Sequence, residues 1–208
     1  GIAIDIIVNL NGLTLSNSNY YVASVTTPLT ANITAAPVTI SGLTASNKVY
    51  DTTTAATLVG TKTVAGLLST DASTVSGNTT ATFASADAGS AIGVAVNVSG
   101  LTLSNANYYV AGVTSPLSAN ITPAPVTISG LTASNKVYDT TTAATLTGTS
   151  EIAGGLLGSD TATLSGTATA GTFASANVGN AIAVTANLSS LSLSNANYYV
   201  AGVTSPLS

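Results

Sequence analysis

The sequence predicts an all-β fold, a tandem array of small immunoglobulin-like β-sandwich domains. Three observations predict it: a composition rich in Thr, Val, Ser, Ala and Asn, a nearly identical internal repeat, and a succession of short extended segments separated by Gly and Asn. β-branched side chains crowd the backbone at Cβ and favour extended chain. About seven short strands with regularly spaced turns are typical of a sandwich. The order of the strands stays open, so a β-grasp-like repeat is the alternative.

The internal repeat has a period close to 88 residues, because Val38–Leu58 recurs residue for residue as Val126–Leu146. Leu101–Val113 recurs with one change as Leu191–Val203, and two extra residues enter between these segments, near Gly154 and Gly171. Such a period is too long for one solenoid coil and suits one small domain per repeat. We therefore expect three sections: residues 1–36, the C-terminal part of a preceding repeat; 37–124, a complete repeat; and 125–208, a repeat that lacks its last strand. The native protein is expected to be longer in both directions.

Within the complete repeat, one segment carries no alternation of polar and apolar residues. Val64–Asp71 is expected to form a single helical turn or a loop. Strands are expected at the following segments: Val38–Ile40, Lys48–Tyr50, Ala55–Val59, Asn78–Phe83, Ile92–Val98, Leu101–Leu103, Tyr108–Val113 and Leu117–Ile121.

Paired tyrosines enter the penultimate strand of each repeat after a polar segment. Tyr108 and Tyr198 occupy the position of the tyrosine corner in immunoglobulin-like sandwiches. The simpler interpretation is that one tyrosine of each pair lies in the core and its neighbour, Tyr109 or Tyr199, is exposed, because adjacent strand residues face opposite ways.

The joint between repeats contains proline and no Gly/Ser linker. Ala119–Gly130 runs the last strand of one repeat into the first strand of the next through Pro123 and Pro125. Proline holds φ near −65°, and X-Pro segments are extended and semi-rigid. The joint predicts a stiff array instead of loosely tethered domains.

The composition excludes several classes of function. Charged residues make up 5% of the chain, and the only bases are Lys48, Lys62 and Lys136. Three lysines cannot form the basic surface that nucleic acid requires. His and Cys are absent, so the usual ligands of zinc and the usual groups of acid–base and thiol catalysis are missing. No segment is long and apolar enough to insert into a membrane. We expect no catalytic activity, no cofactor and no metal.

One motif suggests a family. Lys48-Val49-Tyr50-Asp51 recurs as Lys136-Val137-Tyr138-Asp139, followed in each repeat by TTTAATL, then TFASA and the closing NYYV. This ordered series resembles the YDG repeat family of large bacterial surface proteins, among them filamentous-haemagglutinin-like adhesins. The resemblance implies secretion, display at the cell surface, and adhesion or fibre architecture, and it supplies no catalytic residues. The structural-motif residues are Lys48, Tyr50, Asp51, Lys136, Tyr138 and Asp139, with Tyr108 and Tyr198.

The motif departs from the family name where Thr52 and Thr140 stand in place of Gly. A β-branched residue disfavours positive φ, so the turn after Asp51 is expected to differ from a Tyr-Asp-Gly turn. The Asp51 carboxylate is expected to accept a backbone N–H two residues on, as an Asx-turn.

Two sharper interpretations compete with ordinary structural roles for the charged residues. In one interpretation, Lys48 and Lys136 form Lys–Asn isopeptide crosslinks. In the other, they are ordinary lysines at strand ends, exposed or loosely paired with Asp. The carboxylates Asp71, Asp87 and Asp160 would suggest calcium, but Asn177 replaces Asp87 in the other repeat and the flanking residues are poor in ligands.

The sequence predicts a structural, self-associating repeat region of an extracellular surface fibre or adhesin stalk. Its partners are expected to be other copies of itself, lateral or end-to-end, with any host or matrix surface bound through regions outside this chain. Low charge leaves little to oppose association between surfaces. The alternative is a ligand-binding adhesin module that recognises a host glycan or protein, which usually presents an aromatic or charged cluster.

Overall fold

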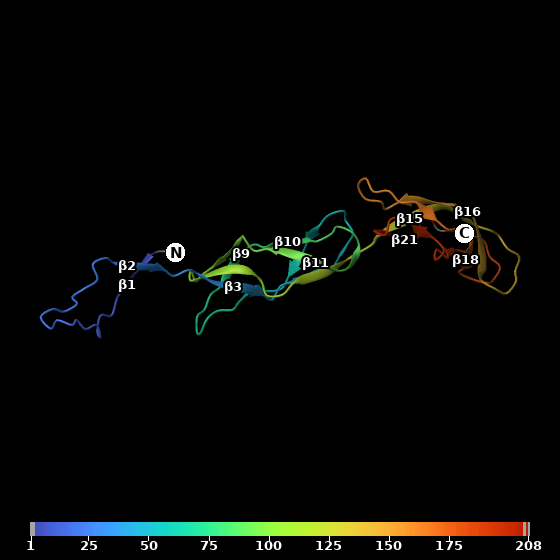
Figure 1. Ribbon diagram of the computed structural model, residues 1–208. Helices are drawn as coiled ribbons and strands as arrows, with labels where there is room; N and C mark the ends of the chain where they lie inside the picture. The colour runs from blue at the N-terminus through green and yellow to red at the C-terminus, as the bar shows by residue number, and fades with distance from the viewer. Residues whose placement is uncertain (1–2, 206, 208) are drawn as a thin grey trace. The chain divides into compact units, whose positions relative to one another are not determined.

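The computed structural model describes residues 3–205 and 207, and it contains β-strands and no helix in this part of the chain. The chain divides into two compact units. Unit 1 comprises Gly1–Gly42, Thr61–Thr79 and Asn97–Thr114, and unit 2 comprises Leu43–Gly60, Thr80–Val96 and Ser115–Ser208. The units cut across the sequence repeats, because unit 2 combines part of the complete repeat with residues 125–208. Figure 1 labels the main strands of both units. The described residues include no helix that could span a membrane.

Unit 1 is built from three small sheets. Strand β3 (Ala36–Ser41) lies between β13 (Tyr108–Val113), to which it is parallel, and β8 (Thr63–Ala65), to which it is antiparallel. Val38 and Ile40 alternate with half-buried neighbours on β3 and face the interior. The other pairs are β1 (Ala3–Ile6) with β2 (Leu29–Asn32), and β9 (Val75–Gly77) with β12 (Leu101–Leu103), both antiparallel.

Unit 2 contains two five-stranded sheets. The first has the order β5-β14-β11-β10-β6 and belongs to the complete repeat. Its strands are Lys48–Val49, Leu117–Thr122, Gly89–Asn97, Thr80–Phe83 and Ala55–Ala56, in that order. Strand β14 is the second in this order, and it lies parallel to β5 on one side and antiparallel to β11 on the other.

The second sheet of unit 2 has the order β19-β18-β16-β15-β21 and belongs to the last repeat. Its strands are Val184–Ala186, Ala170–Phe173, Ala143–Gly154, Ala124–Ala133 and Tyr198–Val203. Two short pairs complete the unit, β4 (Thr44–Ala45) with β7 (Leu58–Val59), and β17 (Leu164–Ser165) with β20 (Ser192–Leu193).

Glycines with positive φ bend the long pair of strands β15 and β16. Gly130 has φ of 85°, and a Cβ there would lie 2.0 Å from the carbonyl oxygen of Thr149. Gly148 faces the opposite carbonyl in the same way. Only glycine fits two backbones this close, so the pairing register shifts between Ser129 and Leu131 and the sheet curves.

The all-β prediction is confirmed, and the sandwich needs correction. The sheets curl into a half-barrel and a near-closed barrel, and they do not form clear immunoglobulin-like sandwiches. In both the complete repeat and the last repeat, the first strand pairs parallel with the tyrosine-bearing strand, β3 with β13 and β15 with β21. Each expected strand overlaps an observed one, and Val64–Asp71 is the end of β8 followed by a loop. Within the complete repeat, strands β4 and β9 lie outside the expected segments.

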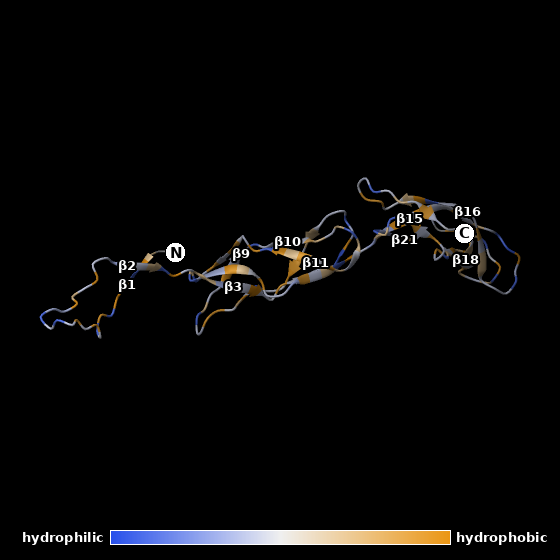
Figure 2. Ribbon diagram, in the orientation of Figure 1, coloured by the Kyte–Doolittle hydropathy of each residue, from blue (hydrophilic) through white to orange (hydrophobic). Residues whose placement is uncertain are grey.

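Two clusters of buried residues form the core of unit 2. The first gathers Tyr50, Ala81, Phe83, Val94, Ala119, Ile121, Ala124, Val126 and Tyr198. The second gathers Ile128, Leu131, Ala144, Leu146, Ala168, Val184 and Leu207. The apolar residues follow the strands in Figure 2. The second cluster comes from the last repeat alone, whereas the first draws on both repeats.

Candidate functional site: the junction between two repeats

The first core cluster lies at the junction of the two repeats. Phe83 and Ile121 belong to residues 37–124, while Val126 and Tyr198 belong to residues 125–208, and all four are buried. Strand β14 ends at Thr122 and β15 begins at Ala124, so Pro123 alone separates them. Because burial of apolar surface is the main favourable term in folding, each repeat contributes to the stability of the other.

Tyr50 of the complete repeat contacts side chains of the last repeat. Its hydroxyl donates to Asp160 Oδ2 at 2.8 Å, and the Tyr198 hydroxyl donates to the same oxygen at 2.7 Å. The two rings meet edge to face, with centroids 5.4 Å apart and an interplanar angle of 79°. This geometry is the one that aromatic quadrupoles favour. We call Tyr50, Asp160 and Tyr198 the tyrosine–aspartate clasp.

The clasp keeps its phenols neutral and its carboxyl ionised. The hydrogen bond to Asp160 is the main cause that raises the pKa of Tyr50 from its ordinary value of 10.0 to about 12. Burial is the main cause that raises the pKa of Tyr198. The hydroxyls of Tyr198 and Tyr50 lower the pKa of Asp160. The shifts of Tyr50 and Asp160 have one main origin, because phenol donors stabilise a carboxylate and the carboxylate in turn disfavours phenolate, and at Tyr198 the same hydrogen bond adds to the effect of burial.

A second polar contact joins the repeats beside the clasp. The Asn197 side chain donates from Nδ2 to Asp87 Oδ1 at 2.9 Å, and its Oδ1 accepts the Ala88 N–H at 2.7 Å. Asn195 holds Asn197 in turn, because the Asn197 N–H donates to Asn195 Oδ1 at 3.0 Å. The side-chain amide therefore satisfies both a carboxylate and a backbone donor of the preceding repeat.

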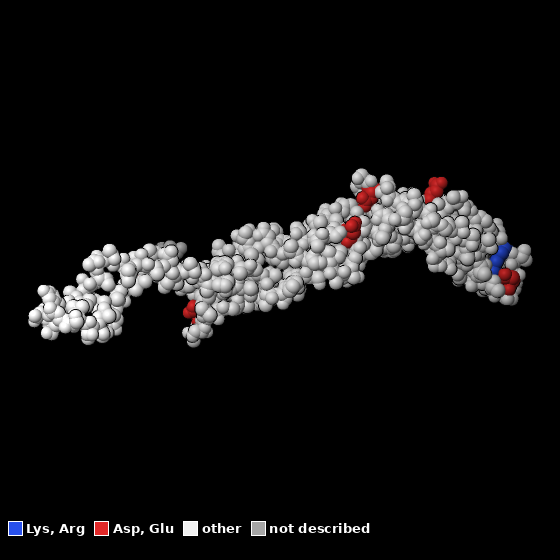
Figure 3. Space-filling view, in the orientation of Figure 1, with Lys and Arg blue, Asp and Glu red and all other residues white. Residues whose placement is uncertain are grey.

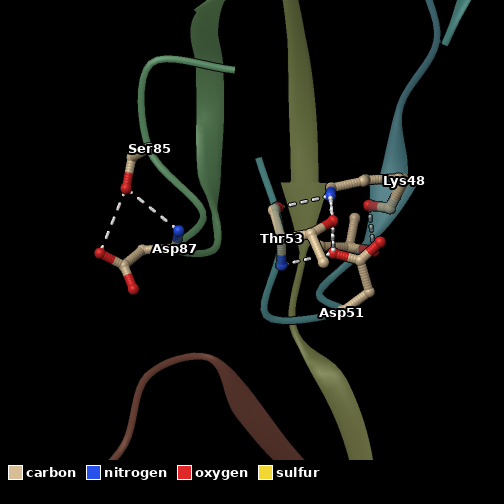
Figure 4. A network of polar contacts seen from close by, with 6 residues as sticks. Lys48, Asp51, Thr53, Ser85 and Asp87 are labelled. Carbon is tan, nitrogen blue, oxygen red and sulfur yellow. Dashed lines mark hydrogen bonds and ion pairs between the residues drawn. The ribbon is translucent and has the colours of Figure 1, made fainter. Parts of the chain in front are cut away.

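The KVYD motif forms a tight turn that aims Tyr50 at the junction. Lys48 Nζ donates to Asp51 Oδ1 and to the Thr53 carbonyl oxygen, each at 2.6 Å (Figure 4). The Asp51 carboxylate also accepts the Thr53 N–H at 2.9 Å, which confirms the expected Asx-turn. The Lys48 hydrogen bond is the main cause that lowers the pKa of Asp51. Lys48 Nζ also lies 5.5 Å from the centroid of the Phe83 ring, within cation–π range.

Thr52 takes the positive φ that a β-branched residue disfavours. Thr52 and Thr140 both adopt φ of 68°, in the left-handed region that favours glycine. A β-branched residue is strained there, and the contacts of Asp51 and Thr53 on either side hold the turn closed. The local hydrogen bonds therefore outweigh the backbone preference of threonine.

The same turn recurs in the last repeat. Lys136 Nζ donates to Asp139 Oδ1 at 2.7 Å, and this contact is the main cause that lowers the pKa of Asp139 from its ordinary 3.8 to about 2. Tyr138 differs from its counterpart, since 57% of it is exposed compared with 7% of Tyr50. Both lysine amines are thus engaged by Asp and Thr in their own turns, and neither is shown joined to an Asn side chain.

The tyrosine corner does not form at Tyr108 and Tyr198. The Tyr108 hydroxyl donates to Asp71 Oδ2 at 2.6 Å and accepts the Leu68 N–H at 3.2 Å, about 40 residues upstream instead of a few. The hydrogen bond to Asp71 is the main cause that raises the pKa of Tyr108. The simpler interpretation is confirmed, because Tyr108 and Tyr198 are buried and Tyr109 and Tyr199 are half exposed.

Asp71 and Asp160 are the site residues that sequence reasoning missed. The sequence suggests only a calcium-binding role for them, yet each accepts the hydroxyl of a tyrosine 37 or 38 residues further along the chain. Their recurrence at one position in each repeat was the available signal. Within residues 3–205 and 207, no three acidic, His or Cys residues gather as they would around a metal ion.

The family comparison explains why the motif recurs. A model of the YDG domain matches residues 34–115 and again residues 122–205. The chain belongs to the YDG domain family. Residues 116–121 lie between the two matches, and the clasp joins Tyr50 of one YDG domain to Asp160 and Tyr198 of the next. No curated protein and no solved structure matches the chain.

Proposed function

We propose that these tandem YDG domains are a non-catalytic, structural repeat region of an extracellular bacterial surface fibre or adhesin stalk. The observation that carries the proposal is the junction, where a buried cluster and a shared carboxylate belong to two consecutive domains. A domain whose core is completed by its neighbour is useful when it is displayed in a row, as in other linear arrays.

The joint supports a load-bearing role. Independent domains on flexible linkers bend freely and unfold one at a time. Here a single proline connects β14 to β15, and Tyr50, Asp87 and Asn197 add polar contacts across the joint. Bending the joint would expose Ile121 and Val126, which are 1% and 0% exposed. Stiffness therefore follows from burial as well as from proline.

The surface supports association between copies. Seven acidic and three basic residues are spread over 208 positions. On the face drawn in Figure 3 the charged side chains form isolated spots and one adjacent pair of opposite charge. Two such surfaces meet little electrostatic repulsion and lose little ion hydration when they pack together.

Immunogold electron microscopy of intact source cells tests the proposal. Antibodies raised against residues 1–208 should label extended structures outside the envelope without permeabilisation. Antibodies against a known cytoplasmic protein of the same cells are the control for leakage. Labelling that appears only after permeabilisation, or only on the inner face of the envelope, would overturn the proposed surface role.

A further inference from the structure

One short turn of each repeat combines an exposed asparagine with a serine two residues later. In the complete repeat, Asn97 ends strand β11 and Ser99 lies in the turn before β12. In the last repeat, Asn187 and Ser189 hold the same positions between β19 and β20. All four residues are exposed. Both turns therefore present Asn-x-Ser, the acceptor sequence for N-linked sugars, at the surface of the chain.

The turn fixes the asparagine side chain through its oxygen. Asn97 Oδ1 accepts the Ser99 N–H at 2.9 Å, and Asn187 Oδ1 accepts the Ser189 N–H at 3.1 Å. The Ser189 hydroxyl also donates to Asn187 Oδ1 at 2.8 Å. Within the described residues, Nδ2 of neither asparagine donates to a protein acceptor, in contrast to Asn197, whose Nδ2 donates to a carboxylate. The amide nitrogen, which is the atom that a sugar would join, is therefore available while the amide oxygen is held.

The middle residue of the sequence anchors the turn. The Leu101 N–H donates to the Val98 carbonyl, and the Leu191 N–H donates to the Leu188 carbonyl, each at 3.0 Å. Val98 and Leu188 are half-buried, whereas the asparagine and the serine on either side of each are exposed. The acceptor side chain is thus displayed by the packing of the turn as well as by its sequence.

The Asn-x-Ser sequence is kept where the residues around it change. From Val94 to Leu101, four of the eight positions differ in the last repeat, yet the asparagine and the serine keep their places. The turn itself does not require the serine. Asn9, in the first section of the chain, makes the same turn with Asn11, whose N–H donates to Asn9 Oδ1 at 2.9 Å. The serine hydroxyl of the two later turns therefore has no explanation in the turn alone.

The other Asn-x-Ser/Thr sequences of the chain are less suited to carry a sugar. Asn120 is half-buried within β14, and its Oδ1 accepts the Ala91 N–H at 2.8 Å. Asn32 is its counterpart in the preceding section. Asn78 is exposed, but Thr167 takes its place in the last repeat. The sequence in the turn is the one that combines exposure with recurrence in both repeats.

We propose that Asn97 and Asn187 are N-glycosylation sites, at which a glycosyltransferase of the source cell attaches a sugar to Nδ2. The sugar donor is a nucleotide- or lipid-linked sugar diphosphate, and Nδ2 attacks its anomeric carbon. The new C–N bond forms as the bond from that carbon to the diphosphate oxygen breaks. The diphosphate leaves with the electron pair, and a base of the transferase takes one Nδ2 proton. Hydrogen bonds from the serine to Oδ1 favour loss of this proton, because they stabilise the negative charge that develops on the amide.

Sugars at these turns would supply hydration that the few charges of the chain do not. Charged residues make up 5% of the sequence, and surfaces so poor in charge associate readily. An N-linked sugar is bulky and solubilising, so one sugar in each repeat would keep the turn from packing and leave other faces to associate. The inference rests on the proposed surface role, because this modification marks surface loops of secreted proteins, and it deepens that role by naming the modification.

Peptide mass spectrometry of the protein purified from its source cells tests the proposal. Peptides that contain Asn97 or Asn187 should be heavier by whole sugar residues, and electron-transfer fragmentation should place the sugar on the asparagine. The same chain produced in a host that lacks N-glycosyltransferases is the control and should show the unmodified masses. Asn9 is an internal control, because it makes the same turn without a hydroxyl two residues later, and it should carry no sugar.

Two substitutions at one position separate the hydroxyl from the turn. Ser99→Ala removes the hydroxyl and keeps the backbone N–H that Asn97 accepts, so Asn97 should lose its sugar. Ser99→Thr keeps a hydroxyl and should remain glycosylated. Unmodified Asn97 and Asn187 in the protein from source cells would overturn the proposal, as would a sugar on Asn97 that persists in Ser99→Ala or a sugar on Asn9. Each of these results leaves the immunogold test of surface display unaffected.

Discussion

Replacement of Val126 by Ala should loosen the preceding repeat. Val126 is 0% exposed and lies in the first core cluster beside Ile121 and Phe83 of that repeat. The change removes two methyl groups, at about 0.8 kcal/mol each, and leaves a small cavity. The sum is a loss of about 2 kcal/mol, which is about a 30-fold increase in the population of opened states.

Hydrogen exchange followed by mass spectrometry measures this effect. Amides of β10, β11 and β14, which belong to the first complete repeat, should exchange about 30-fold faster in Val126→Ala. The matched control is Leu146→Ala, which removes a buried side chain from the second cluster, made of the last repeat alone. That variant should accelerate exchange in β16 and β18 and leave β10 unchanged. The reasoning is refuted if Val126→Ala accelerates exchange only within residues 125–208.

Three further predictions concern the KVYD turn and the clasp. Thr52→Gly should stabilise the chain by about 0.5–1 kcal/mol in urea unfolding, because glycine adopts the observed φ of 68° without strain. Thr53→Gly, which removes the Oγ1 contact to Asp51 and adds backbone freedom, should destabilise the chain. A loss of stability in Thr52→Gly would contradict the claim that Thr52 is strained at its positive φ. In the folded chain the pKa of Asp139 is lowered from its ordinary value of 3.8 to about 2. The stability that this carboxylate contributes is therefore complete above pH 3.8 and is lost as the pH falls to about 2. Thermal unfolding of Asp139→Asn should lack that part of the pH dependence, and an equal slope in the variant would count against the ion pair. In alkali, the pKa of Tyr50 is raised from 10.0 to about 12, so its contribution is complete below pH 10 and is lost as pH rises towards 12. Phenolate absorbance should show that Tyr50→Phe removes a group titrating near pH 12, and loss of a group titrating near pH 10 instead would refute the hydrogen bond to Asp160.

The strands were largely predictable because their signals are local. Val38 and Ile40 alternate with polar neighbours, Gly42 ends the run, and a strand formed there. The Asx-turn at Asp51 was equally local, since it depends on atoms two residues apart. Strand β9 was not predictable, because Val75-Ser76-Gly77 has too few apolar residues to show an alternating pattern. It is a strand because it pairs with the strand that begins at Leu101.

The curl of the sheets and the clasp could not be predicted in the same way. The curve at Gly130 depends on its close approach to Thr149 on the paired strand, and the parallel pairing of β15 with β21 joins residues far apart in sequence. The positive φ of Thr52 was not predictable either, because hydrogen bonds that form only in the folded turn outweigh the intrinsic φ preference of threonine. Asp160 is 110 residues from Tyr50, and nothing local distinguishes its carboxylate from that of any exposed Asp.

Sequence repetition gave an indirect signal for the clasp. Asp71 and Asp160 keep one place in the two repeats, as do Tyr108 and Tyr198, and each pair is hydrogen bonded in the structure. Tyr50 joins only the second of these pairs, because its partner belongs to the following repeat. The contact of Tyr50 with Asp160 joins two repeats, so the sequence of a single repeat contains no signal for it.

The nuclear Overhauser effect between the rings of Tyr50 and Tyr198 tests most directly whether consecutive repeats share a core. Their ring centroids lie 5.4 Å apart, so the chain labelled at tyrosine should show a cross-peak between them, identified by its absence in Tyr50→Phe. The Leu157 N–H, which donates to the Tyr198 hydroxyl within the last repeat, provides an internal reference. A cross-peak between Tyr50 and Tyr198 is the result the shared core predicts. Contacts of Tyr198 with Leu157 alone, with none to Tyr50, would contradict it.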